Sequence, residues 1–196
     1  MEQFYLEKPS LKRKNDIIDY INELVIYNSE INGIETLAKI LDDYTFEQAL
    51  DYCLNLEEDE FAKKLGKSQV KTFLLIRVED NKIVGALNVR FNFTEKMNVF
   101  DGNIGYGIRP LERRKGYNKI NLYLGLLESQ KVGLDKVNLV CEANNLGSVK
   151  TIESLGGILE KTGIDPVDGV LTNLYSIDVG ETINKYKETY ENNFLV

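Results

Sequence analysis

Three consecutive cations and a glycine stand where a strand gives way to a helix. Between Asn103 and Pro110, apolar side chains alternate with two glycines, the pattern of a strand with one bare side that something approaches closely. Cations occupy positions 113–115, directly before Gly116 and an apolar helical stripe. The first N–H groups of a helix lack internal partners and its dipole is positive there, which predicts a phosphate or pyrophosphate site. The alternative is a surface turn that carries basic residues.

The loop Arg113-x-x-Gly116-x-Asn118 resembles the Arg/Gln-x-x-Gly-x-Gly/Ala loop of the GNAT superfamily of N-acetyltransferases. The wider string GYGIRPLERRKGYNK, followed downstream by CEANNLGSVKTIESLGG, is similar to one bacterial branch of predicted acetyltransferases. This resemblance covers residues 72–179, and the two motifs in order are more specific than either alone. Asn118 stands where the family has Gly or Ala, so its side chain either crowds the phosphates or adds a hydrogen bond.

The resemblance implies acetyl-coenzyme A as co-substrate. It assigns the pyrophosphate to the backbone of residues 114–119, and polarisation of the thioester carbonyl to the amides near Ile108. Asn145 and Ser148 fall where the family's Asn-x-x-Ala faces the pantetheine arm, although a plain helix cap is the competing interpretation of Asn145. The expected cofactor-binding residues are Ile108, Arg113, Arg114, Lys115, Gly116, Tyr117, Asn118, Lys119, Asn145 and Ser148.

Amine acetylation requires a group that takes a proton and a group that gives one. The chain has no histidine, which excludes an imidazole base and Ser-His-Asp, Cys-His or HExxH machinery. The candidate catalytic residues are Glu142, Asp101 and Tyr106, with solvated carboxylates and a core side chain as the alternatives. The family's thiolate-protonating tyrosine is replaced by Ile152, so the sequence predicts unassisted departure of the thiol or another hydroxyl, such as Tyr106 or Tyr117. No metal is implied.

Composition limits the class of protein. A chain of 196 residues suits one domain with a substantial core. The formal charge of −7 argues against a nucleic-acid partner and favours cationic small molecules or basic peptide tails as acceptors. Cys53 and Cys141 lie far apart without a CxxC motif, so we expect small core residues there. No apolar run reaches about 18 residues and the first residues lack a basic start, which predicts a cytoplasmic protein without membrane association.

The elements that position these residues follow from hydrophobic periodicity. Strands are predicted at 4–7, within a hairpin over 73–93, and at 104–108, 137–141, 157–161 and 170–179. Helices are predicted at 11–27, at 34–41, from a capping box at Thr45 to Leu54, after Gly116 up to Gly133, from 145 to 155, and at 181–194. The acidic run 57–60 is expected to be a solvated face, and 92–102 a polar loop.

These elements predict one α/β (α+β) domain over residues 1–196. The resemblance implies a GNAT-like domain in which a mixed, mostly antiparallel twisted sheet is flanked by helices and a central parallel strand pair is splayed around the cofactor. It further implies a variable helical acceptor side at 1–71, a cofactor-binding core at 72–179 and a C-terminal helical tail at 180–196. The tail either docks on the domain or forms a homodimer contact.

The predicted function is an N-acetyltransferase that moves the acetyl group of acetyl-coenzyme A to a primary amine of a small molecule or peptide by direct attack. The alternative is a non-catalytic acyl-coenzyme A sensor, which keeps the phosphate loop without proton-handling groups. A phosphotransferase is disfavoured because the loop lacks the Gly-x4-Gly-Lys-Ser/Thr pattern that holds a triphosphate with magnesium.

Overall fold

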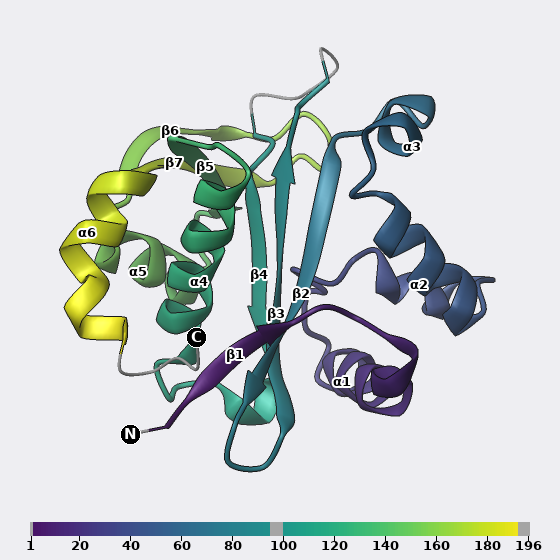
Figure 1. Ribbon diagram of the computed structural model, residues 1–196. Coiled ribbons are helices and arrows are strands. Elements are labelled where there is room, and N and C mark those ends of the chain that lie inside the picture. Colours follow the sequence, from purple (N-terminus) through teal and green to yellow (C-terminus); the bar gives the residue numbers. More distant parts are fainter. Residues whose placement is uncertain (1, 95–99, 192–196) are drawn as a thin grey trace.

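The computed structural model describes residues 2–94 and 100–191, which form two antiparallel sheets (Figure 1). The first sheet has the order β1-β2-β3-β4, and the second has the order β5-β7-β6. The strands of the first sheet are β1 (Phe4–Glu7), β2 (Gln69–Arg77), β3 (Lys82–Phe91) and β4 (Ile104–Ile108). Those of the second are β5 (Lys136–Glu142), β6 (Ile158–Ile164) and β7 (Leu171–Asp178).

The helices lie on opposite sides of the first sheet: α1, α2 and α3 on one side, and α4, α5 and α6 with the second sheet on the other (Figure 1). Their bounds are α1 (Lys14–Ile26), α2 (Phe46–Asn55), α3 (Asp59–Lys64), α4 (Tyr117–Lys131), α5 (Leu146–Ser154) and α6 (Val179–Tyr190). Three short 3-10 helices are η1 (Leu11–Arg13), η2 (Leu37–Leu41) and η3 (Pro110–Glu112).

Most predicted elements are present, with two local differences. The helix predicted over 34–41 is the 3-10 helix η2, because its stripe of apolar residues is too short to sustain an α-helix. The acidic run 57–60 contains the start of α3, whose first turn carries two of its carboxylates, where the helix dipole favours them. The capping box of α2 is confirmed: Thr45 and Gln48 each accept the other's backbone N–H.

The two sheets meet where β4 and β5 begin. The backbone N–H of Asn103 donates to the Asn138 carbonyl and its side chain accepts from the Asn138 N–H, both at 2.7 Å. Three residues further along each strand, Cys141 is still close enough to Tyr106 to influence its pKa. The strands β4 and β5 therefore run in the same direction. The two strands then separate without a ladder. The predicted α/β class is confirmed, and the sheet is divided at this point.

Three apolar clusters hold the elements together. Helices α1 and α2 pack on one face of β2 and β3, and α4 packs on the other face. The third cluster joins β5 and β7 to α4, α5 and α6. Cys53 and Cys141 are buried free thiols, and burial raises the pKa of Cys141 to about 11. Both are therefore core residues, as the sequence predicted.

Helix α6 docks on the domain. The Tyr190 ring lies 4.9 Å from that of Tyr123, whose hydroxyl donates to the Ile183 carbonyl at 3.3 Å. The last residues of the helix predicted at 181–194, and part of the loop predicted at 92–102, fall outside the described residues. Among the helices that the structure describes, none has the length and apolar character needed to cross a membrane.

Candidate functional site

The turn before α4 presents a run of unpaired backbone donors. Arg114 and Gly116 have left-handed backbones, with φ of +68° and +86°. Within the described residues, the N–H groups of residues 114–118 have no acceptor in hydrogen-bonding geometry. The other described non-glycine residues with positive φ are all asparagines, which tolerate that region better than arginine does. Backbone strain and unpaired amides therefore coincide where the sequence predicted an anion site.

A buried carboxylate anchors this turn. Glu112 is 6 % exposed and accepts hydrogen bonds from Arg77 at 2.8 Å, Lys82 at 2.9 Å and Lys115 at 2.7 Å. Burial alone raises the pKa of Glu112, but these three cations outweigh it and lower the pKa to about 2. Lys115 is thus neutralised within the protein. Three adjacent cations at 113–115 would repel one another, and the acid directly before them reduces that repulsion.

Removing this anchor should destabilise the fold. Glu112→Gln leaves three cations without their shared counter-charge, and we expect a loss of about 3 kcal/mol in the free energy of unfolding at pH 7. Because the folded pKa is depressed, the carboxylate stabilises the fold above its ordinary pKa, and this contribution is lost as pH falls towards about 2. Urea titrations at pH 7 and pH 3 measure it: the difference between wild type and variant should shrink at pH 3.

The control for this prediction is Glu188→Gln. Glu188 is exposed on α6, and no described residue forms an ion pair with it. The control should unfold like the wild type at both pH values. An equally small effect of Glu112→Gln would contradict an anchoring role.

A cavity of about 590 Å³ opens beside the turn, and we call it the loop cavity. Its walls come from β4, the turn, the starts of α4 and α5, and the segment 27–32 that follows α1. The predicted residues that line it are Tyr106, Ile108, Arg113, Arg114, Gly116, Tyr117, Asn118, Lys119, Asn145 and Ser148. Lys115, bound to Glu112, is the one predicted cofactor-binding residue outside this lining.

Two asparagines of this cavity have structural partners. Asn118 donates through Nδ2 to Thr151 Oγ1 at 3.4 Å and so turns towards α5, away from the amides of the turn. Its Oδ1 is buried without a partner. Asn145 Oδ1 accepts the Ser148 N–H at 3.1 Å, so the helix-cap interpretation of Asn145 is confirmed. The Asn145 Nδ2 group remains available to a ligand.

Tyr106 carries a hydroxyl without a hydrogen bond. Its oxygen is buried beside the Ser148 hydroxyl, has no partner in full hydrogen-bonding geometry among the described residues, and belongs to a residue that lines the loop cavity. Burial raises the pKa of Tyr106, and the neighbouring Ser148 hydroxyl offsets this only in part. The phenol therefore keeps its proton at neutral pH. A buried unsatisfied hydroxyl costs stability, which makes this side chain a functional candidate.

The other predicted catalytic or acid groups lie outside the loop cavity or, as for Tyr117, already have hydrogen-bond partners. Asp101 lines a different cavity, and Glu142 lines neither of the two cavities. The Tyr117 hydroxyl already donates to Glu2 at 2.6 Å and accepts from Arg77 at 3.2 Å. Ile152 is fully buried in the cluster around β5. Tyr106 is thus the predicted catalytic residue that the fold brings together with the turn.

The bare side of β4 is occupied by the chain itself. A Cβ on Gly107 would lie 2.9 Å from the Asn32 carbonyl oxygen, and one on Gly105 would lie 3.2 Å from Glu35. The glycines therefore admit the segment 32–35, and the close approach that they predicted is intramolecular. Residues 103 and 109, at the two ends of β4, hydrogen-bond to the backbone of β3. Backbone groups alternate in direction along an antiparallel strand, so the N–H groups of Tyr106 and Ile108 point the other way, towards β5. These amides face the gap between the sheets.

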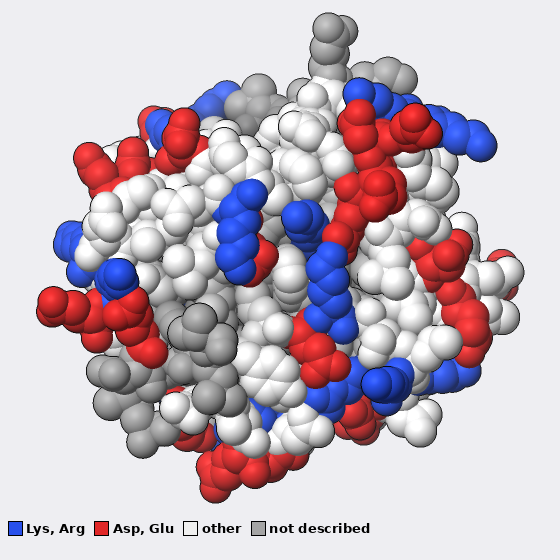
Figure 2. All heavy atoms as spheres, viewed as in Figure 1, with Lys and Arg blue, Asp and Glu red and all other residues white. Residues whose placement is uncertain are grey.

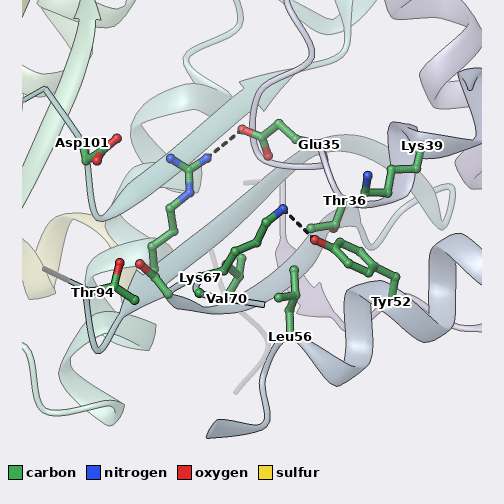
Figure 3. Close-up of a pocket in the computed structure, with 12 residues that line it drawn as sticks. Glu35, Thr36, Lys39, Tyr52, Leu56, Lys67, Val70, Thr94 and Asp101 are labelled. Atoms are coloured by element: carbon green, nitrogen blue, oxygen red, sulfur yellow. Dashed lines mark hydrogen bonds and ion pairs between the residues drawn. The ribbon is translucent and has the colours of Figure 1, made fainter. Parts of the chain in front are cut away.

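A second cavity of about 510 Å³ is lined by Glu35, at the end of the segment 32–35 (Figure 3). We call it the Tyr52 cavity. Glu35 pairs there with Arg90 at 3.1 Å and accepts from the buried Asn88. The lining residues are Glu35, Thr36, Lys39, Tyr52, Leu56, Gly66, Lys67, Ser68, Val70, Arg90, Thr94 and Asp101.

A buried arginine, Arg109, links the end of β4 to helix α1. Arg109 directly follows β4, is 4 % exposed, and donates to Glu23 at 2.7 Å and to Asp19 on α1. It also donates to the Ile83 carbonyl at 3.1 Å. The end of β4 is therefore tied to the helix that precedes the segment 27–32. In the sequence, the only sign of this role is that Arg109 stands between the predicted strand and Pro110.

The surface charge is mixed rather than of one sign. On the face drawn in Figure 2, acidic and basic side chains alternate, and the basic groups do not merge into one broad patch. Many of the surface charges are paired, as Lys14 is with Glu47 and Lys63 with Asp59. Local charge in each cavity, rather than the charge of the whole chain, decides what binds there.

No family model and no curated protein sequence matches the chain. Solved structures do. A spermidine N-acetyltransferase from Vibrio cholerae in complex with CoA and spermine matches with a TM-score of 0.61 and 15 % identity, over 93 % of this chain and 99 % of that one. A microcin C7 self-immunity acetyltransferase in complex with acetyl-CoA and AMP matches with 0.60 and 19 %, over 90 % and 92 %. A GNAT-family acetyltransferase from Streptococcus pneumoniae matches with 0.60 and 13 %, over 90 % and 99 %.

Proposed function

The chain has the fold of the GNAT acetyltransferases, and on this basis we propose that it transfers the acetyl group of acetyl-coenzyme A to a primary amine of a small molecule or peptide. The observation that carries the proposal is the row of unpaired amides at residues 114–118, which opens into the loop cavity. Two solved neighbours, one with acetyl-CoA and one with CoA and spermine, support the choice of co-substrate and of an amine acceptor.

The turn before α4 binds the pyrophosphate in this proposal. The unpaired amides donate hydrogen bonds, and the positive end of the helix dipole attracts the anion. Arg114 and Lys119 line the cavity and form no ion pair with a described residue, so their charge is available to phosphate. The Glu112 anchor holds the turn in its left-handed shape. A bound polyanion also relieves the strain at Arg114, because it gives the amides their missing acceptors.

The gap between β4 and β5 positions the reacting end. Acetyl-coenzyme A supplies an acetyl thioester: a bond from the amine nitrogen to the acetyl carbon forms, and the carbon–sulfur bond breaks. The outward N–H groups of Tyr106 and Ile108 stabilise negative charge on the carbonyl oxygen. The amine loses one proton to solvent or to a carboxylate, and the sulfur gains one. Tyr106 lines this same cavity, keeps the proton of its buried hydroxyl, and is the donor in the proposal.

A non-catalytic sensor is the competing function, and turnover separates the two. We expect the purified chain to release free thiol from acetyl-coenzyme A only when a primary amine is present. The measurement is thiol release with a panel of amines, with mass spectrometry of the acetylated product. Binding of acetyl-coenzyme A by calorimetry without amine-dependent thiol release would favour the sensor.

A further inference from the structure

The Tyr52 cavity holds two lysines that form no ion pair with a described residue. The Lys39 ammonium lies 5.0 Å from the centre of the Tyr52 ring, and the Lys67 ammonium lies 5.5 Å from it. Lys67 also donates to the Tyr52 hydroxyl at 2.8 Å. Figure 3 shows both lysines reaching towards this tyrosine from separate segments of the chain. Neither forms an ion pair with any described residue.

The carboxylates of the same cavity do not cancel this charge. Glu35 is already bound to Arg90 at 3.1 Å and to Asn88, so this acid and this arginine offset one another. What remains is two lysines against Asp101, which Figure 3 shows across the cavity from Lys39. Two ammonium groups near one ring repel each other, and a bound anion removes that repulsion. The local charge is thus opposite in sign to that of the whole chain.

The cavity also reaches the strand that the proposed chemistry uses. Its wall residue Glu35 lies 3.2 Å from the position of a Cβ on Gly105, in the middle of β4. From there the segment 32–35 leads to the loop cavity, whose lining includes Asn32. The two cavities therefore lie along the same segment of chain, next to β4. The volume of the Tyr52 cavity, about 510 Å³, is in the range of small-molecule sites.

From this placement we propose that the acceptor is a small primary amine that carries an anionic group, a carboxylate in the simplest case, which Lys39 and Lys67 hold beside Tyr52. The inference rests on the proposed function for the amine and on the cavity alone for the anion. It departs from the expectation of a cationic small molecule or a basic peptide tail, which followed from the charge of −7. Spermine, the ligand named for one solved neighbour, has no anionic group for these lysines.

Four six-carbon probes test the proposal: 6-aminohexanoate, hexylamine, 1,6-diaminohexane and hexanoate. We expect kcat/KM for 6-aminohexanoate to exceed that for hexylamine about tenfold, as two partly exposed ion pairs allow. The diamine should be the poorest of the three amines, and hexanoate should compete with 6-aminohexanoate. The preference should shrink as salt is raised, because surface charges are screened over about 8 Å at physiological ionic strength.

Matched variants separate the cavity from general charge. Lys39→Met and Lys67→Met should each lower the preference for 6-aminohexanoate about threefold. Lys64→Met is the control, since Lys64 is exposed on α3 and outside the cavity. It should leave the preference unchanged. Equal use of hexylamine and 6-aminohexanoate, or a preference for the diamine, would overturn the inference while leaving the acetyltransferase proposal intact.

A binding measurement tests the anion site independently of the proposed acetyltransferase activity. Hexanoate is titrated into the protein by calorimetry without acetyl-coenzyme A, and the titration is repeated with the Lys39→Met/Lys67→Met double variant. Binding to the wild type and loss in the double variant would support the anion site even if no thiol were ever released. Equal heats in both proteins would overturn it.

Discussion

Gly116→Glu should abolish binding of acetyl-coenzyme A while the chain stays folded. Gly116 has φ of +86°, a conformation that costs an L-residue about 1–2 kcal/mol. No atom lies within 4 Å of a Cβ built there, so the side chain meets no steric clash in the protein itself. The carboxylate would instead stand among the amides that receive the pyrophosphate. Because like charges at close range cost several kcal/mol, we expect affinity to fall at least about 100-fold in calorimetry.

Two further variants separate backbone strain from charge. Gly116→Ala carries the left-handed strain without the carboxylate and should weaken binding much less than Gly116→Glu. Gly133→Glu puts the same residue at φ of +80° beyond the other end of α4, also with open space around it. It should lose similar stability and bind normally. Equal affinities of wild type and Gly116→Glu would place the cofactor site elsewhere.

Tyr106→Phe should lower turnover about 100-fold with acetyl-coenzyme A affinity unchanged, the size expected for loss of a proton donor. The same change should leave the fold as stable as before or about 1 kcal/mol more stable, because the hydroxyl is buried without a hydrogen bond. Opposite effects on rate and on stability are not expected of a core side chain. The measurements are steady-state thiol release, calorimetric affinity and urea unfolding on one preparation.

Tyr20→Phe is the matched control. Tyr20 also has a buried hydroxyl without a partner, but it lies in the cluster of α1 and outside both cavities. It should match Tyr106→Phe in stability and the wild type in turnover. Unchanged turnover in Tyr106→Phe would mean that the thiol leaves without an acid. Unassisted departure of the thiol is one of the two outcomes predicted from Ile152, which stands where the family has its tyrosine.

Local signals were sufficient for the elements and for the turn. The capping box at Thr45, the glycine stop at Gly133 and the strand–turn–helix around Gly116 depend on residues close together in the chain. Their hydrogen bonds close over three or four residues, so short-range pattern determines them. The unpaired amides at 114–118 also follow from the way a helix begins. The fold class and the unpaired amides of this turn could therefore be predicted from the sequence alone.

Long-range contacts decided where each candidate residue lies. The sequence does not distinguish the three catalytic candidates by their position relative to a cavity. In the fold, Tyr106 lines the loop cavity, Asp101 lines the Tyr52 cavity and Glu142 lines neither. The two glycines of β4 predicted that some group approaches the strand closely. In the fold that group is the chain's own segment 32–35.

Charge depended on the fold in the same way. Three cations at 113–115 appeared to repel one another until Glu112 was buried among partners 30 and 35 residues away. The lysines of the Tyr52 cavity come from positions 39 and 67, and no local pattern links them. Burial and pairing set both pKa and hydrogen-bond satisfaction, and these depend on groups that only tertiary packing brings together.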